Sequence, residues 1–311
     1  MTQVKIQSLN ISTEKGTIKT PVDRIEINET GVKGDAHAGY WHRQVSLLAV
    51  ESLKKAEDQN KRKFNFGDFG ENITTEGIEL HRCNILDQFQ CGDVLLEVTQ
   101  IGKKCHTGCE IMQKVGTCIM PIEGIFCRVL KGGELKVGEE LNYIPKQVKI
   151  AIITLSDRAY RGEYKDLSGP RVKEILLDYF HNDKKDCHID LEIMPDDAGT
   201  LTDLLSKAAD RYNLIITTGG TGIGPRDITV ETVRPMLSKE IPGVMEYIRV
   251  KYGSWKPNAL LSRGVAGILG KAIIYTIPGS EKAADEYMKE IIKTLNHTMM
   301  MQYGIDTHRH G

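Results

Sequence analysis

Residues 214–227 read Leu-Ile-Ile-Thr-Thr-Gly-Gly-Thr-Gly-Ile-Gly-Pro-Arg-Asp, and this stretch decides the fold of the C-terminal half. Its first five residues are apolar or β-branched, which is typical of a strand buried on both faces of a parallel sheet. The glycines that follow let the backbone approach a ligand closely and direct N–H groups at an anionic phosphate. The stretch therefore predicts a strand that ends in an anion-binding turn, although such a turn can also be purely structural.

The same alternation of strand and helix extends outward from this stretch. Apolar strands are predicted at 148–155, 189–194 and 272–277. Helical spacing predicts helices over 168–180, with Ser168 as N-cap and Pro170 in the first turn, over 201–208 and over 284–295. Alternating strands and helices predict a three-layer α/β domain with a parallel sheet over residues 148–311.

The N-terminal half has a different pattern. Short runs of strand-forming residues are separated by glycine turns from residue 4 to about 141. Such a pattern predicts a mainly antiparallel sheet or β-barrel, here a domain over residues 1–144. One helix is expected over 46–60, and the basic residues 61–63 are interpreted as its solvated end.

Composition excludes several function classes. A chain of 311 residues is long enough for two domains. Its net charge of -1 gives no overall attraction to nucleic acid or to an anionic membrane. The sequence shows no secretory signal and no apolar stretch of membrane-spanning length, so we expect a cytoplasmic protein. Its seven cysteines, an odd number, favour reduced thiols over a disulfide framework.

Polar residues follow each predicted strand of the α/β domain, where parallel sheets bind ligands. They are Ser156 to Arg158, Pro195 to Asp197, Thr217 to Asp227, and Pro278 to Ser280. Arg226 offers a forked cation to a phosphate, and Asp196 and Asp227 offer carboxylates that can hold Mg²⁺. A cation, two carboxylates and an amide cradle together indicate phosphoryl or nucleotidyl transfer.

Two common nucleotide motifs are excluded. Residues 264–272 resemble a P-loop, but the first glycine is one position too early and Ala272 replaces the metal-binding Ser or Thr. The turn after residue 218 lacks the register of dinucleotide folds, because Pro225 stands where the last glycine belongs.

Six motifs of this half occur together in order. They are 156–159 (Ser-Asp-Arg-Ala), 166–170 (Asp-Leu-Ser-Gly-Pro), 217–222 (Thr-Thr-Gly-Gly-Thr-Gly), 225–229 (Pro-Arg-Asp-Ile-Thr), 241–243 (Ile-Pro-Gly) and 278–280 (Pro-Gly-Ser). Residues 148–297 thereby resemble the molybdopterin adenylyltransferase family, the MogA/MoaB group. The resemblance implies that the phosphate of molybdopterin attacks the α-phosphate of Mg-ATP and that pyrophosphate leaves. It also implies a trimer.

The resemblance also assigns the site. The two functional aspartates of the family correspond to Asp196 and Asp227, which we expect to be catalytic through Mg²⁺ and phosphate positioning. The residues expected to line the pterin and nucleotide pockets are Ser168, Gly169, Gly219, Gly220, Thr221, Gly222, Arg226, Pro278, Gly279 and Ser280. Glu281 departs from the usual proline and adds negative charge at this point.

Six of the seven cysteines lie between Cys83 and Cys127. Cys105 follows two lysines that would lower the pKa of its thiol, which makes it the candidate reactive cysteine. Cys83, Cys91 and Cys127 are interpreted as small buried hydrophobes. An alternative zinc site of Cys105, His106, Cys109 and Cys118 lacks the usual paired spacing.

Motifs at 31–37, 43–46, 67–74, 102–106 and 124–126 resemble a MOSC domain over residues 4–143. The family is a β-barrel associated with molybdenum-cofactor binding or sulfur carriage, and its characteristic cysteine corresponds to Cys105. His37, Arg43 and Lys103 either meet the pterin phosphate or are ordinary residues of the barrel rim.

The leading hypothesis is a two-domain enzyme of molybdenum-cofactor assembly that uses Mg²⁺, ATP and molybdopterin, and whose MOSC domain either binds Mo-pterin or carries sulfur on Cys105. The expected partners are small molecules, a molybdenum-insertion protein or client molybdoenzymes. A non-catalytic molybdopterin carrier and a nucleotide hydrolase on the same fold remain as alternatives.

Overall fold

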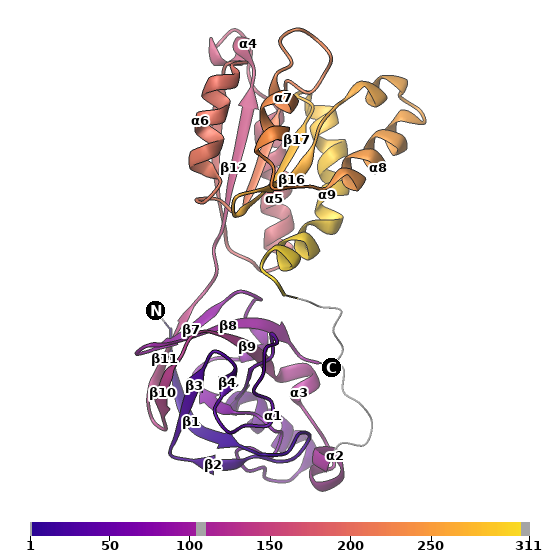
Figure 1. The fold of residues 1–311 in the computed structure, drawn as a ribbon. Helices are drawn as coiled ribbons and strands as arrows, with labels where there is room; N and C mark the ends of the chain where they lie inside the picture. The colour runs from indigo at the N-terminus through magenta and orange to yellow at the C-terminus, as the bar shows by residue number, and fades with distance from the viewer. Residues whose placement is uncertain (1, 104–109, 306–311) are drawn as a thin grey trace. The chain divides into compact units, whose positions relative to one another are not determined.

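The computed structural model of the protein describes residues 2–103 and 110–305. The chain divides into two compact units, Met1–Lys146 and Gln147–Gly311 (Figure 1). None of the helices within the described residues combines the length and the apolar composition needed to cross a membrane.

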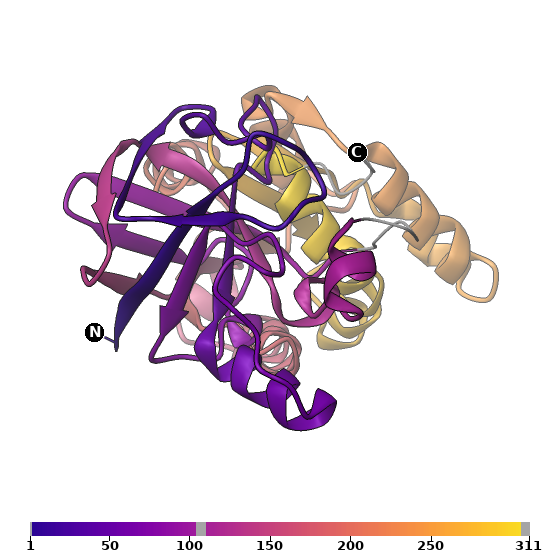
Figure 2. The ribbon, with the colours of Figure 1, turned by 90° about the horizontal axis from the view of Figure 1, so that it is seen from below.

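The first unit is a β-barrel. Its strands are β1 (Thr2–Ile11), β2 (Thr20–Val22), β3 (Arg24–Asn28), β4 (Gly31–Val32), β5 (Val45–Ala49), β6 (Ile73–Glu76), β7 (Gln88–Cys91), β8 (Val94–Ile101), β9 (Ile125–Lys131), β10 (Gly133–Lys136) and β11 (Glu140–Ile144). The main sheet has the order β11-β7-β8-β9-β5-β6-β1-β2, and pairing of β11 with β1 closes it. The remaining strands form a small sheet in the order β10-β3-β4. Figure 2 shows the unit from another side. The predicted barrel is confirmed.

Short helices connect the barrel strands. They are α1 (Val50–Asn60), η1 (Leu80–Arg82), α2 (Glu110–Val115) and α3 (Met120–Glu123). The predicted start of the first helix at Ser46 is wrong, because Val45–Ala49 forms strand β5. All five residues of β5 are buried between β9 and β6, so tertiary packing overrides the helical spacing that continues into α1. Residues 61–63 after α1 are exposed, as expected for a solvated helix end.

The second unit contains one six-stranded sheet. Its strands are β12 (Val148–Leu155), β13 (Cys187–Met194), β14 (Leu214–Thr218), β15 (Lys239–Glu240), β16 (Ala266–Leu269) and β17 (Ala272–Ile277). Strands β13, β12, β14 and β17 are parallel in that order, and β16 and β15 continue the sheet in antiparallel pairing. The four predicted strands are confirmed, with β13 beginning two residues earlier than expected. The excluded P-loop segment, residues 264–272, contains strand β16 and the tight turn into β17.

Helices cover both faces of this sheet. They are α4 (Asp157–Tyr160), α5 (Ser168–Asn182), α6 (Ala198–Ala208), α7 (Thr229–Val233), η2 (Arg234–Met236), α8 (Pro242–Gly253), η3 (Pro257–Leu261) and α9 (Glu281–Gln302). Apolar residues of α5, α8 and α9 pack in one core with the sheet, and those of α6 and α7 pack in the other. Figure 1 shows α6 and α9 on opposite sides of β12. The three-layer architecture is confirmed.

Ser168 is the first helical residue of α5, not its N-cap as predicted. Its N–H donates to Asp166 Oδ1 at 3.0 Å, and the N–H of Gly169 donates to the same oxygen at 3.2 Å. Asp166 therefore supplies the acceptor that the exposed N–H groups at a helix start require.

Candidate functional site

The carboxyl ends of four parallel strands lie side by side in the second unit. Strand register pairs Leu155 with Met194, Thr154 with Thr218, and Thr218 with Ile277. The chain runs from β12 to β13 on one side and then crosses back to β14 on the other side of β12. The strand ends at such a reversal of strand order form the usual ligand crevice of open α/β sheets. The structure thus gathers the four polar segments at one sheet edge.

The turn after β14 needs glycine at its first two positions. Gly219 has φ 102° and Gly220 has φ 63°, a region that residues with a Cβ rarely adopt. A Cβ on Gly219 would lie 2.3 Å from the carbonyl oxygen of Leu155. A Cβ on Gly220 would lie 2.3 Å from Thr229 Oγ1. The two glycines therefore let the turn pack directly on β12 and α7.

Asp196 and Asp227 lie near each other at this edge. Burial raises the pKa of Asp196, and the negative charge of Asp227 raises it further. Asp227 Oδ2 accepts the N–H of Gly224 at 2.7 Å, which orients its carboxylate along the glycine turn. Like charges held this way are stabilised when a cation binds between them.

Asp157 connects three of the strand-end segments. The N–H of Asp157 donates to Asp196 Oδ2 at 3.1 Å, and the N–H of Asp196 donates to Asp157 Oδ1 at 3.1 Å. Asp157 Oδ2 also forms an ion pair with Arg226. The Asp157 side chain is 13% exposed and that of Arg226 is 69% exposed, so the carboxylate is fixed and the guanidinium can move. Sequence reasoning named the segment of Asp157 without assigning it a role, although its place directly after a strand matches that of Asp196.

Ser168 and Gly169 lie behind the glycine turn. Ser168 is 1% exposed, and its hydroxyl lies 2.6 Å from Thr218 Oγ1 and donates to Asp166 Oδ1 at 2.9 Å. Asp166 Oδ2 in turn accepts from Thr154 Oγ1 at 2.7 Å. This buried polar network joins the start of α5 to the ends of β12 and β14, so these residues support the turn from inside. Thr221 is likewise buried, at 3% exposure.

Residues 278–280 border the glycine turn on the side of β17. A Cβ on Gly279 would lie 3.1 Å from Gly219 Cα, so the two turns are in close contact. Ser280 caps α9 by accepting the N–H of Ala283 at 3.3 Å. Gly279, Ser280 and Glu281 are exposed, and Pro278 is half-buried. This third turn completes the rim of the candidate site.

The donor set fits a magnesium ion that also contacts substrate phosphates. Within the described residues, no group of three or more His, Cys, Asp or Glu side chains is arranged to hold a metal by itself. Mg²⁺ commonly binds through one or two carboxylates, with substrate phosphates and water as the other ligands. Asp196 and Asp227 supply that number of carboxylates, and their mutual repulsion is what a divalent cation would relieve.

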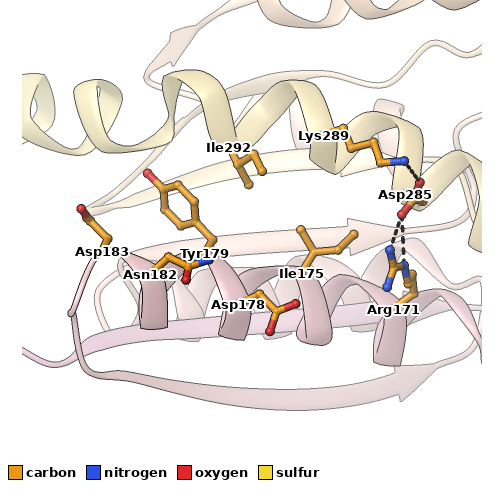
Figure 3. Close-up of a pocket in the computed structure, with 9 residues that line it drawn as sticks. All are labelled: Arg171, Ile175, Asp178, Tyr179, Asn182, Asp183, Asp285, Lys289 and Ile292. Atoms are coloured by element: carbon orange, nitrogen blue, oxygen red, sulfur yellow. Dashed lines mark hydrogen bonds and ion pairs between the residues drawn. The ribbon is translucent and has the colours of Figure 1, made fainter.

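A separate groove of about 470 Å³ runs between α5 and α9 (Figure 3). Arg171, Asp285 and Lys289 form a chain of ion pairs at one end of it. None of the described site residues of the strand ends lines this groove.

In the barrel, the predicted reactive Cys105 lies outside the described residues, as do His106 and Cys109 of the alternative zinc site. Burial raises the pKa of Cys83 to about 12 and the pKa of Cys127 well above its usual value. Burial and the charge of Glu139 also raise the pKa of the half-buried Cys91. The prediction of small buried hydrophobes is confirmed for Cys83 and Cys127, whereas Cys91 is half-buried and its thiol donates to Glu139 Oε2 at 3.6 Å.

Several basic residues of the barrel have charged or aromatic neighbours. Lys19 Nζ is fully buried and lies 2.6 Å from Asp35 Oδ2. The charge of Lys103 contributes to lowering the pKa of Lys19, so the two cations lie near each other. His37 Nδ1 lies 3.4 Å from Asp35 Oδ1, and the guanidinium of Arg43 stacks 4.7 Å from the centroid of the Trp41 ring.

An open α/β sheet with a glycine turn and two neighbouring carboxylates at its strand ends defines a class of ligand-binding α/β domains. The model of a family described as probable molybdopterin binding domain matches residues 151–297, and the MOSC domain model matches residues 34–142.

Three curated relatives match the second half of the chain. A molybdopterin adenylyltransferase of Helicobacter pylori is 34% identical over 159 residues, which cover 50% of this chain and 89% of the relative. The molybdenum cofactor biosynthesis protein B of Staphylococcus carnosus is 39% identical over 50% of this chain and 90% of its own length. The molybdenum cofactor synthesis protein cinnamon of Drosophila melanogaster is 36% identical, and the match spans only 25% of its length.

The chain therefore belongs to the molybdopterin adenylyltransferase family of molybdenum-cofactor biosynthesis, the MogA/MoaB group, and carries a MOSC domain ahead of the family domain. The resemblance inferred from the motifs is confirmed.

Proposed function

We propose that the α/β domain transfers AMP from ATP to the terminal phosphate of molybdopterin. In this reaction a phosphate oxygen of molybdopterin forms a bond to the α-phosphorus of ATP, and the bond to pyrophosphate breaks with its electron pair leaving on pyrophosphate. The observation that carries the proposal is that Asp227, which accepts the N–H of Gly224 in the glycine turn, lies near enough to Asp196 for its charge to raise the pKa of Asp196. That arrangement is suited to a polyphosphate and its divalent cation.

The side chains would contribute by positioning and not by proton transfer. A phosphate nucleophile is already ionised at neutral pH, so the reaction needs no general base. Asp196 and Asp227 would hold Mg²⁺, which neutralises charge on the phosphates when bound. Arg226 is exposed and paired with Asp157, and it would exchange that partner for a phosphate oxygen.

Pyrophosphate release by the full chain with molybdopterin, ATP and Mg²⁺ tests this function. We expect release that depends on molybdopterin and is lost in Asp196→Ala and Asp227→Ala. Pyrophosphate release that survives either substitution would contradict the proposal. Cleavage of ATP without molybdopterin would instead indicate a nucleotide hydrolase, and tight pterin binding without turnover would indicate a carrier.

For the MOSC domain we propose binding of Mo-pterin, or carriage of sulfur on Cys105. The support is the positive charge of Lys103 and Arg43, which could meet a pterin phosphate, whereas the fully buried Lys19 is paired with Asp35. Gly102 N–H donates to the carbonyl of Gly124 at 2.7 Å, which anchors the segment that leads to Cys105.

Mo-pterin binding and sulfur transfer are compared in Cys105→Ala and in the control Cys91→Ala. We expect Cys105→Ala to lose sulfur transfer or weaken binding while Cys91→Ala resembles the unmodified protein, because burial keeps the Cys91 thiol protonated. Full activity of Cys105→Ala would contradict a role for this thiol.

The proposal includes a cytoplasmic homotrimer that delivers its product to a molybdenum-insertion protein or to client molybdoenzymes. Sedimentation equilibrium of the full chain checks the trimer. A monomer at all concentrations would contradict it.

A further inference from the structure

Arg263 lies next to the segment that resembled a P-loop, and its backbone is fixed by the sheet. The N–H of Val265 donates to Thr276 Oγ1 at 2.8 Å, and the N–H of Thr276 donates to the carbonyl of Val265 at 2.9 Å. A Cβ on Gly264 would lie 2.3 Å from the carbonyl oxygen of Thr276, so this glycine allows close packing on β17. Arg263 therefore projects from a rigid base.

From this base Arg263 holds the glycine turn in three places. Its N–H donates to the carbonyl of Thr221 at 2.9 Å, and its Nε donates to the carbonyl of Gly222 at 2.7 Å. Its Nη2 lies 3.5 Å from the carbonyl oxygen of Asp227. Glu231 in the first turn of α7 forms an ion pair with the guanidinium, which fixes the orientation of the fork.

These contacts determine where the N–H groups of the turn point. In a planar trans peptide the C=O and the following N–H point in opposite directions. Because the carbonyls of Thr221 and Gly222 point at Arg263, the N–H groups of Gly222 and Ile223 point away from it. Neither N–H has a protein acceptor in the part of the chain that the structure describes.

We propose that Arg263 is a positioning residue for a nucleoside triphosphate. It holds the glycine turn so that the N–H groups of Gly222 and Ile223 point at phosphate oxygens. Arg263 acts through the turn and through Asp227 and does not itself contact the ligand. Glu231 orients it. The identity of the ligand rests on the proposed adenylyl transfer. The bracing of the glycine turn by Arg263 does not depend on that function.

Arg171 on α5 offers a matched control. Its side chain is 32% exposed against 37% for Arg263, and it pairs with Asp285 at 2.5 Å (Figure 3). It contacts no part of the glycine turn in the described structure. Arg171→Met and Arg263→Met therefore each remove an arginine that pairs with carboxylates, but only the second removes the side-chain contacts to Gly222 and Asp227.

The first experiment uses the full chain without nucleotide. Hydrogen–deuterium exchange is followed in residues 219–228, and we expect faster exchange in Arg263→Met, a smaller increase in Glu231→Gln and no change in Arg171→Met. Unchanged exchange in Arg263→Met would overturn the brace. This arm does not depend on any catalytic activity.

The second experiment measures molybdopterin-dependent pyrophosphate release. We expect Arg263→Met to raise KM for Mg-ATP about tenfold with a smaller change in kcat, because hydrogen bonds to a charged group are lost from the nucleotide-binding turn. Guanidinium ion at low concentration should restore part of the lost affinity in Arg263→Ala. Unchanged KM in Arg263→Met, or a loss confined to thermal stability, would overturn the inference. Absence of pyrophosphate release by the unmodified protein would count against the proposed function alone.

Discussion

Asp35 in the barrel is a buried carboxylate and Asp196 in the α/β domain is a half-buried one, and their pKa values are shifted in opposite directions. Burial would raise the pKa of Asp35, but hydrogen bonds from His37 and the charge of Lys19 outweigh it and lower the pKa. Burial and the charge of Asp227 together raise the pKa of Asp196. The barrel thus places a cation beside Asp35, whereas the α/β domain places a second carboxylate beside Asp196.

The carboxylate of Asp35 accepts hydrogen bonds from several donors. Its Oδ2 accepts from Lys19 Nζ at 2.6 Å, from Asn72 Nδ2 at 3.0 Å and from the N–H of Ser12 at 3.1 Å. Such a satisfied network fixes loops and leaves little for a ligand. An incompletely compensated pair such as Asp196 and Asp227 costs stability and is therefore the better candidate for function.

The largest effect is expected from breaking the Asp35 network. Asp35→Ala leaves the charge of Lys19 buried without its partner and should lower the free energy of unfolding by about 3–5 kcal/mol. Urea unfolding with hydrogen exchange in residues 2–103 measures the loss. Glu26→Ala is the control, because Glu26 and Lys33 form an exposed ion pair that is worth about 1 kcal/mol or less. Equal effects of the two substitutions would contradict the contrast.

The same pair has a pH dependence of known sign. Because the pKa of Asp35 is lowered in the folded state, its stabilisation is present above the ordinary aspartate range, near about pH 4, and is lost as pH falls through the folded pKa. The raised pKa of Asp196 has the opposite sign, so its charged form costs stability at neutral pH. Asp35→Ala should therefore lose its effect in acid.

Asp196→Asn should reduce pyrophosphate release by about 100-fold or more, because a charge that positions the reacting phosphates is removed. It should leave the thermal midpoint unchanged or raise it, because repulsion with Asp227 disappears. The neighbouring Asp197 is the matched control. It caps α6 through a 2.8 Å bond from the N–H of Thr200, so Asp197→Ala should cost about 1 kcal/mol of stability and leave KM unchanged. If Asp196→Asn were destabilised but had normal turnover, Asp196 would have a structural role and not a functional one.

Gly220→Ala and Gly34→Ala compare positive-φ glycines in the two domains. A Cβ at Gly220 would meet Thr229 Oγ1, whereas a Cβ at Gly34, where φ is 83°, has no atom within 4 Å. We expect a loss of about 2 kcal/mol for Gly220→Ala and about 1 kcal/mol for Gly34→Ala, since only the first combines backbone strain with a steric clash. Chemical denaturation measures both losses. Nucleotide affinity should fall only in Gly220→Ala.

Asp157→Asn should give the smallest effect. The amide oxygen of Asn can still accept the N–H of Asp196, but the ion pair with Arg226 is lost. Arg226 is then free to meet a phosphate, and KM for ATP should fall by about twofold to fivefold, as expected for an exposed ion pair. Asp157→Ala removes both contacts and should raise KM instead. A rise in both variants would show that the Arg226 pair assists binding and does not compete with it.

Much of the α/β fold could be predicted from local sequence. The observed bounds match the predicted ones for three strands, Val148–Leu155, Leu214–Thr218 and Ala272–Ile277. Each is a short continuous run of apolar and β-branched residues, which has no polar face for a surface helix and favours a buried strand. The start of α1 could not be predicted in the same way. Val45–Ala49 reads as the first turn of a helix, and only its burial between β9 and β6 makes it a strand.

The sequence by itself determined the alternation that builds the sheet and the glycines that its turn requires. It also determined the two aspartates that follow strand ends, because these are properties of residue type and short spacing. Only the tertiary structure decided that Ser168 faces inward, that Asp157 holds Arg226, and that Arg263 braces a turn 41 residues away. Those contacts join segments that are far apart in the sequence. Residue type and short spacing cannot predict which distant side chain the folded sheet brings next to a given carbonyl.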